Sequence, residues 1–138
     1  MANSNALRWR VVVGGIISNF CAGMLYSWSI YVKPLIEAHG WDQGSVSLAM
    51  SIATLVIPIS MIPAAKILAK QGPAKTALIG TVFYVFGLVI SGLANSLPLL
   101  YLGFGVLGGI GVGFIYGTPV ATCIKWFPDK KGLISGLA

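Results

Sequence analysis

The chain has 138 residues, of which 57% are hydrophobic and only 9% are charged. A water-soluble domain carries about 25% charged residues, so this composition excludes an ordinary soluble fold. The net charge is +6, and its clustering at the ends of apolar stretches indicates contact with anionic lipid, not with nucleic acid.

Four uncharged stretches that are long enough to cross a lipid bilayer follow one another, at residues 11–32, 43–65, about 76–94 and about 99–124. The turn residues Asn95 and Pro98 separate the last two stretches. A membrane core about 30 Å thick needs about 20 helical residues, and backbone in lipid must satisfy its own hydrogen bonds. We therefore predict an all-α fold, a polytopic membrane helical bundle with four transmembrane helices.

A further apolar run at residues 132–138 follows the charged segment at 129–131. This run is too short to span a membrane, so we interpret it as the start of a fifth helix. The chain is then expected to be a truncated piece of a longer protein. The alternative is a complete four-helix membrane protein without transport activity, such as a subunit or an assembly factor.

Positive charges mark one set of helix junctions, at Arg8, Arg10, Lys66, Lys70, Lys75, Lys125, Lys130 and Lys131. The other set holds Lys33 together with the acids Glu37 and Asp42. Loops on the cytoplasmic side of a membrane protein are enriched in Lys and Arg. We therefore predict a cytoplasmic N-terminus and a location in the plasma (inner) membrane.

Glycines in the fourth stretch fit two patterns. Gly103, Gly105 and Gly108 spell G-x-G-x-x-G, which in a dinucleotide-binding fold follows a strand and opens an amphipathic helix. Residues 99–124 offer no polar face for such a helix, so a nucleotide is not expected. Glycines also recur every fourth residue, at Gly105, Gly109, Gly113 and Gly117. This spacing favours close packing of two membrane helices.

Polar side chains within the first stretch point to one helical face. Asn19 and Tyr26 share that face with Gly15 and Gly23, while Trp28 points the other way. One interpretation is that the face lines a substrate cavity, in which Tyr26 offers a ring and a hydroxyl. The other is that Asn19 bonds a neighbouring helix and that Tyr26 lies at the membrane interface. The residues alone leave both open.

Hydroxyl side chains occur along one stripe of the second stretch, which includes Ser51 and Thr54. These side chains either contact a substrate or bond their own helix backbone. In the fourth stretch, Tyr116 lies near the glycine stripe. The four stretches contain no carboxylate, so no Asp/Glu proton relay is expected within them. No catalytic set or metal-ligand cluster is present either, and we expect no enzymatic activity and no cofactor.

Segments spread along the chain resemble major facilitator superfamily transporters and, more narrowly, the oxalate/formate antiporter family. They read GMLYSWSIYVKPL at 23–35, AKILAKQGPAK at 65–75, GVGFIYG at 111–117 and KWFPDKKGLISG at 125–136. The second segment resembles the cytoplasmic loop motif of the superfamily, with Lys70, Gly72 and Lys75 retained. Ala65 and Ala69 replace the glycine and the aspartate that are usual there.

This resemblance implies a secondary transporter of small organic anions, mono- or dicarboxylates, that works by alternating access of two six-helix halves. The chain would be an N-terminal fragment of that transporter and would lack the remainder of the transporter chain. Tyr26 and Tyr116 match aromatic positions that such transporters direct into the central cavity. Leu25 stands where members that carry oxalate can have a polar amide. The cations that pair with dicarboxylates in this family lie in the C-terminal half, beyond residue 138.

Overall fold

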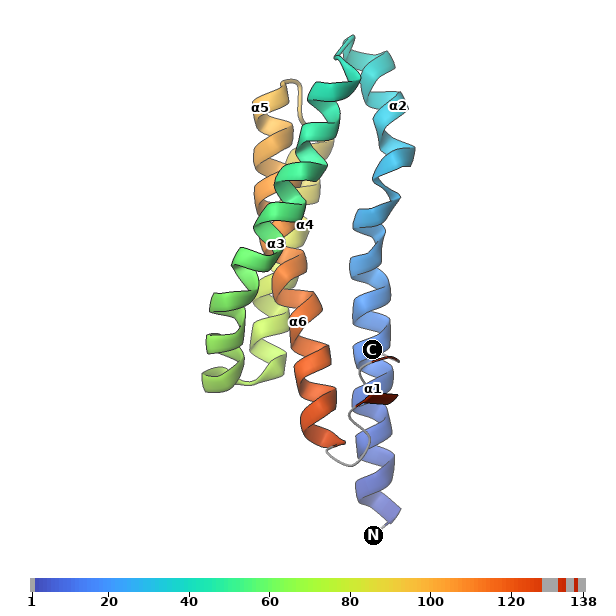
Figure 1. Ribbon diagram of the computed structural model, residues 1–138, viewed down its shortest axis with the longest axis vertical. Coiled ribbons are helices and arrows are strands. Elements are labelled where there is room, and N and C mark those ends of the chain that lie inside the picture. Colours follow the sequence, from blue (N-terminus) through green and yellow to red (C-terminus); the bar gives the residue numbers. More distant parts are fainter. Residues whose placement is uncertain (1, 128–131, 134–135, 137–138) are drawn as a thin grey trace.

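The computed structural model describes residues 2–127, 132–133 and 136, and its helices run up and down beside one another (Figure 1). Four helical stretches are long and apolar enough to cross a membrane, at Trp9–His39, Gln43–Gln71, Pro73–Gly92 and Leu97–Lys125. Within the described residues every regular element is a helix, which confirms the all-α prediction.

The first membrane helix is built from three segments, α1 (Ala2–Ala22), the 3₁₀-helix η1 (Gly23–Ser27) and α2 (Trp28–His39). It continues past residue 32, where the uncharged stretch ends. Lys33 and Glu37 lie on its last turns with their side chains exposed, so their charges do not have to be buried for the helix to continue. It ends at Gly40, whose φ of +66° is favourable for glycine. The Gly40 N–H donates to the Ile36 carbonyl at 2.8 Å.

The second membrane helix, α3 (Gln43–Gln71), begins at a side-chain cap. Asp42 Oδ2 accepts hydrogen bonds from the N–H of Gly44 at 2.9 Å and of Ser45 at 3.3 Å. These bonds satisfy two of the backbone donors that every helix start leaves without an intrahelical partner. The helix runs beyond the predicted 43–65, since an uncharged stretch marks only the part inside the hydrocarbon.

The third membrane helix, α4 (Pro73–Gly92), follows α3 after a single residue, Gly72. Gly72 has a φ of +82°, a conformation that side-chain-bearing residues rarely adopt. Pro73 then occupies the first helical turn, where its missing N–H costs nothing. This junction explains why α4 starts before the predicted 76–94.

The fourth membrane helix consists of α5 (Leu97–Leu100), the π-helix η2 (Tyr101–Gly108) and α6 (Gly109–Trp126). The wider π turn lies in the glycine-rich part, where small residues let the backbone adjust. Tyr101 at its start donates a hydrogen bond through its hydroxyl to the Ser45 carbonyl of α3, at 2.8 Å. The expected span of 99–124 is therefore one continuous rod that changes its helical type.

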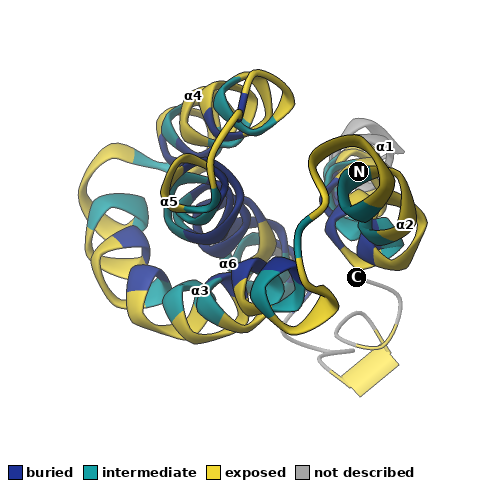
Figure 2. Cartoon of the chain, turned by 90° about the horizontal axis from the view of Figure 1, so that it is seen from above, coloured by how far each residue is buried: buried dark blue, intermediate teal, exposed yellow. Residues whose placement is uncertain are grey.

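The fourth membrane helix lies at the centre of the bundle. Figure 2 shows η2 and α6 surrounded by α3, α4 and the first helix, with most of the buried residues on this central rod. In its most apolar window 61% of the residues are buried, against 28% for the first helix and less for the other two. The glycines of the central helix therefore face neighbours on several sides.

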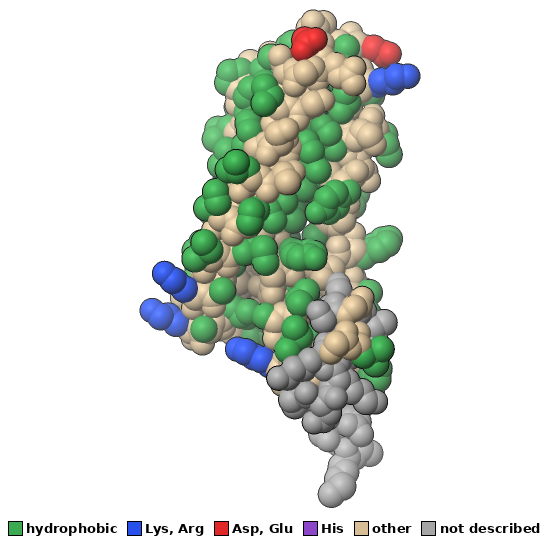
Figure 3. All heavy atoms as spheres, in the orientation of Figure 1, with side chains coloured by type: hydrophobic (Ala, Val, Ile, Leu, Met, Phe, Trp, Pro, Cys, Tyr) green, Lys and Arg blue, Asp and Glu red, His purple; other side chains and the backbone are tan. Residues whose placement is uncertain are grey.

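The surface of the bundle suits a lipid environment. Large apolar side chains such as Phe20, 83% exposed, and Leu93, 69% exposed, cover its length. Figure 3 shows hydrophobic side chains over the visible face and charged ones near its two ends. The predicted start of a fifth helix at 132–138 and the charges at 129–131 lie largely or wholly outside the described residues.

Candidate functional site

One face of the central helix packs against α3 through the glycines that recur every fourth residue. A Cβ added at Gly109 would lie 3.1 Å from the Ala53 carbonyl oxygen, and one at Gly105 would lie 2.8 Å from an Ile52 methyl. A Cβ added at Gly113 would lie 2.7 Å from the Ile57 carbonyl oxygen. At Gly117 the nearest atom is the Met61 methyl, at 3.3 Å. This contact therefore loosens toward the end of the bundle that carries Lys66, Lys70 and Lys125, which we call the inner end.

A second face of the central helix packs against α4, also through glycine. A Cβ on Gly111 would lie 2.6 Å from the Tyr84 backbone nitrogen, and one on Gly87 would lie 2.7 Å from the Gly103 carbonyl. The single stripe identified in the sequence did not include these residues. Gly80 and Gly87 on α4 lie two turns apart on one face, and this spacing was the available signal.

The first membrane helix touches the central helix near the inner end of the bundle. A Cβ on Gly15 would lie 3.1 Å from both the Cys123 sulfur and the Pro119 Cβ. The Cys123 thiol donates to the Val11 carbonyl at 3.9 Å. Cys21 and Cys123 are both free thiols.

The five residues predicted to bind substrate are mostly exposed. Tyr26 is 71% exposed and Tyr116 is 49% exposed. Ser51 and Thr54 are exposed on α3, and Asn19 is half-buried on α1. Exposed polar side chains at membrane depth require either a polar cavity or a further protein surface beside them.

Helix geometry places Tyr116 in the space between α1 and α3. It lies three residues from Gly113, which packs on α3, and three residues from Pro119, which packs on α1. A step of three residues is about 60° around the helix axis. Tyr116 therefore projects between α3 and α1. Asn19 lies on the same side of the contact between α1 and α6.

The hydroxyls differ in what they can offer a ligand. Thr54 donates its hydroxyl proton to the Met50 carbonyl at 2.9 Å, so its oxygen remains available as an acceptor. Among the described residues, no hydrogen bond is formed by the hydroxyls of Tyr26, Tyr116 or Ser51. These three hydroxyls are therefore available to donate a hydrogen bond to a ligand.

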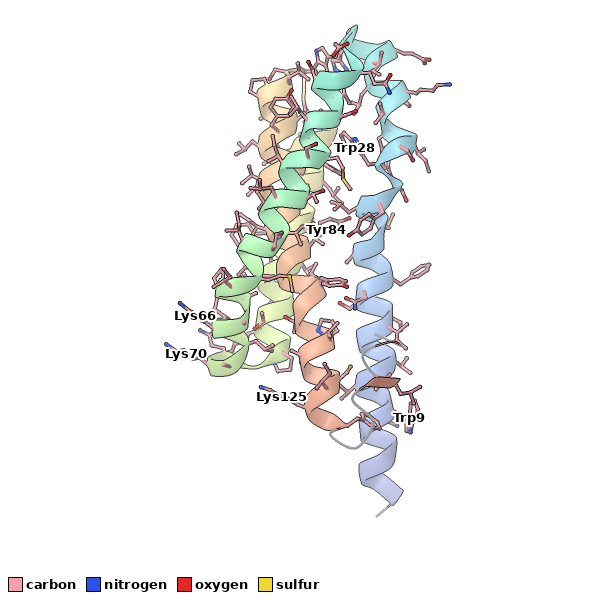
Figure 4. All side chains as sticks on the ribbon, viewed as in Figure 1. Trp9, Trp28, Lys66, Lys70, Tyr84 and Lys125 are labelled. Carbon is pink, nitrogen blue, oxygen red and sulfur yellow. The ribbon has the colours of Figure 1, made fainter. Side chains whose placement is uncertain are left out.

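Two cavities lie on the opposite side of the contact between α1 and α6, and none of the five predicted residues lines them. The outer cavity, about 410 Å³, is lined by residues that include Trp28, Tyr84 and Leu88. Figure 4 shows Trp28 and Tyr84 between the first helix and the rest of the bundle. The inner cavity, about 510 Å³, is lined by residues that include Gly14 and Thr118.

Trp28 lines the outer cavity, and the sequence did not single it out as a candidate. Its side chain is 8% exposed and packs on Phe104, with the ring centroids 4.1 Å apart. Its indole Nε1 is buried and has no hydrogen-bond partner among the described residues. The sequence showed only that Trp28 points away from the face of Asn19 and Tyr26.

Cations gather at the inner end of the bundle. The side chains of Lys66, Lys70 and Lys125 extend outward there (Figure 4), and Lys75 is also exposed. In the loop motif, Gly72 makes the turn, while Lys70 and Lys75 stand on either side of it. The described residues contain no group of three His, Cys, Asp or Glu side chains that could hold a metal ion.

Comparison with known proteins gives a consistent result. A model of the Major Facilitator Superfamily matches residues 15–138. The oxalate:formate antiporter of Oxalobacter formigenes is 31% identical over 130 residues, which cover 94% of this chain and 31% of that protein. An uncharacterised MFS-type transporter of Escherichia coli (strain K12) is 29% identical over 137 residues, or 99% of this chain and 34% of that protein.

Monocarboxylate transporter 9 of Gallus gallus is 26% identical over 134 residues, covering 94% of this chain and 26% of that protein. The chain thus spans about a third of the length of these relatives or less. The match to the family model and the four apolar helices together indicate an integral membrane protein. The resemblance seen in the sequence is confirmed, and the chain belongs to the major facilitator superfamily.

Proposed function

We propose that the chain is the N-terminal part of a secondary transporter of small organic anions, mono- or dicarboxylates, that works by alternating access. The observation that carries this proposal is the similarity to the oxalate:formate antiporter over 94% of the chain. The similarity to a monocarboxylate transporter supports the same substrate class. The full transporter would include the polypeptide that follows residue 138.

The substrate would contact the exposed donors between α1 and α3. Tyr116 projects into that space, and the Tyr26 hydroxyl has no partner among the described residues. Ser51 is exposed on α3 and would contribute its hydroxyl from the neighbouring face of that helix. A phenol bonds a carboxylate well, since hydrogen bonds to charged groups are worth about 1.5–3 kcal/mol. Asn19 and Thr54 would contribute to the polarity of the same wall.

The inner end, with Lys66, Lys70, Lys75 and Lys125, would face the cytoplasm. The N-terminus lies at this end as well, so it would also face the cytoplasm. The protein would reside in the plasma membrane. Anionic lipid headgroups would neutralise these cations. The packing glycines Gly105, Gly109, Gly113 and Gly117 would hold α3 and the central helix together while the two halves of the transporter rock.

The test is uptake of radiolabelled oxalate and formate by the full-length protein in proteoliposomes. Tyr26→Phe and Tyr116→Phe remove only a hydroxyl, and each should raise KM about tenfold or more, as expected for one lost hydrogen bond to an anion. The control is Tyr31→Phe, whose residue lines the outer cavity on the other side of the bundle. Absence of any carboxylate uptake by the wild-type protein would contradict the proposed substrate class.

A further inference from the structure

The middle of the first membrane helix, η1 (Gly23–Ser27), winds as a 3₁₀-helix between two α-helical segments. The Trp28 N–H donates to the Leu25 carbonyl, three residues back, which is the hydrogen bond of this helix type. The local sequence does not require this winding. The segment GMLYS holds no proline, Met and Leu favour the α-helix, and a Cβ added at Gly23 would meet nothing within 4 Å. The cause therefore lies in the packing of the helix against its neighbours.

Buried residues recur at every third position along this part of the helix. Ala22, Leu25 and Trp28 are all buried. A 3₁₀-helix has three residues per turn, so side chains three positions apart lie directly above one another. In an α-helix, at about 100° per residue, Trp28 would lie about 120° away from Ala22 around the axis. The 3₁₀ winding therefore lets all three side chains face the core at once.

Trp28, the outermost of the three, packs on a partner that is itself held firmly. Its ring lies on that of Phe104, with the centroids 4.1 Å apart, and Phe104 is buried on η2. The residue before it, Gly103, lies so close to α4 that an added Cβ would be 2.9 Å from the Gly87 carbonyl oxygen. Three residues before Phe104, the Tyr101 hydroxyl is bonded to α3. Phe104 therefore gives Trp28 a fixed surface, which holds the end of η1.

The winding of η1 also decides the direction of Tyr26, which lies on this segment. Tyr26 follows the buried Ala22 by four residues, and this step leaves it about 120° around the axis in a 3₁₀-helix. In an α-helix the same step would leave it only about 40° from Ala22. The 3₁₀ form thus turns the phenol away from the core, in accord with its exposure of 71%. Each residue that returned to α winding would turn Tyr26 back by about 20° toward the central helix.

We propose that Trp28 is a positioning residue for the substrate. By packing on Phe104 it holds η1 in the 3₁₀ form, and this form directs the Tyr26 hydroxyl toward an anion between α1 and α3. Trp28 acts without touching the anion, because it lines the outer cavity on the opposite side of the contact between α1 and α6. The inference rests on the proposed function for the role of Tyr26. The geometric link between Trp28 and Tyr26 does not depend on transport.

Thiol labelling of the full-length protein in membranes tests the geometric link. Tyr26→Cys is made in a background without other cysteines, and its reaction with a membrane-impermeant thiol reagent is followed. We expect Trp28→Ala to slow this labelling severalfold, since position 26 then turns toward the central helix, and Trp28→Phe, which keeps a ring on Phe104, to preserve it. The matched control is Leu100→Ala, which removes a buried side chain of the same core cluster outside the first helix. This control should leave the labelling rate unchanged.

Uptake kinetics test the positioning role. Trp28→Ala should raise KM about tenfold, as Tyr26→Phe does, because in both variants the anion loses the hydrogen bond from Tyr26. The double variant should then show no further rise over Trp28→Ala alone, and Trp28→Phe should keep KM near that of wild type. A merely structural Trp28 would lower the maximal rate, leave KM unchanged and leave the effect of Tyr26→Phe in full.

Phe104→Leu is the second variant, for use where Trp28→Ala fails to fold. It removes the ring contact from the other partner with little change in volume, so it should also slow labelling at position 26. Two results would overturn the proposal: labelling that neither change affects, or KM effects of Trp28→Ala and Tyr26→Phe that multiply in the double variant. Labelling that responds to Trp28→Ala in a protein without carboxylate uptake would contradict the proposed function and support the geometric link.

Discussion

The central helix meets its neighbours in two different ways. Against α3 and α4 it packs through glycines, with little space between the backbones. A Cβ added at Gly111 would lie less than 3 Å from Tyr84, and one at Gly113 would lie less than 3 Å from the Ile57 carbonyl. Against the first helix it has a glycine contact at Gly15 near the inner end, and the Trp28 ring on Phe104 near the outer end. The outer and inner cavities lie on one side of this second contact, and Tyr116 lies on the other side.

The difference indicates a division of roles. The central helix, α3 and α4 share many close backbone contacts, so we expect them to move as one rigid unit. The first helix is attached mainly through side chains, contains a 3₁₀ segment in its middle and carries Asn19 and Tyr26. We therefore expect it to adjust more easily than α4 if a substrate binds between it and α3, as proposed.

The largest effect is expected for Gly111→Ala on the closed side. Its Cβ would lie 2.6 Å from the Tyr84 backbone nitrogen, which cannot move without shifting α4, so we expect a loss of about 2 kcal/mol in the free energy of unfolding. The control is Gly14→Ala at the inner cavity, where an added Cβ would meet nothing within 4 Å. This change should leave the free energy of unfolding unchanged or raise it slightly. Measurement is by unfolding in SDS titrations, and equal effects of the two changes would remove the distinction between the sides.

Asp42→Ala tests the connection between the two regions. Asp42 caps α3 directly after the first helix ends, through bonds to Gly44 and Ser45. Loss of a side-chain cap costs about 1 kcal/mol, and Asp42→Asn, which keeps an acceptor oxygen, should lose much less. The same SDS titrations measure both variants. A neutral Asp42→Ala would show that this junction does not depend on the cap.

A smaller effect is expected at Gly15, the inner contact of the first helix. A Cβ there would lie 3.1 Å from the side chains of Cys123 and Pro119. These side chains have room to adjust, and the gain in helix propensity of about 0.5–1 kcal/mol offsets part of the crowding. We expect Gly15→Ala to lie within about 0.5 kcal/mol of wild type. Adding Cys123→Ala should relieve the remainder, which a double-mutant cycle detects as a coupling energy.

Much of this architecture could be predicted from the sequence, because absence of charge over a long stretch has one structural solution in lipid. The stretches located all four helices, and glycine spacing indicated the face of Gly105 and Gly109 that meets α3. Helix ends were placed less well. The first helix and α3 run beyond their uncharged parts, through Lys33 and Lys70 respectively. They end only where Gly40 and Gly72 adopt a positive φ.

The candidate site was predictable only in part. Exposed polar positions such as Tyr26 follow from helical periodicity, but the second glycine face, with Gly111 on Tyr84, requires knowledge of which helix is central. The unpaired donor of Trp28 has no signal in the sequence, since it depends on how α2 packs against Phe104. Hydrogen bonds such as that of Thr54 to its own backbone are likewise decided by the rotamer.

The most direct test of the central claim is the accessibility of Tyr116 in the full-length protein. Tyr116→Cys is made in a background with Cys21→Ser and Cys123→Ala, and its reaction with a membrane-impermeant thiol reagent is followed with and without oxalate or formate. We predict rapid labelling that the anion slows, while Phe86→Cys on the lipid-facing side of α4 reacts slowly and without protection. Labelling of Tyr116→Cys that is absent, or that the anions leave unchanged, would contradict a substrate pathway between α1 and α3.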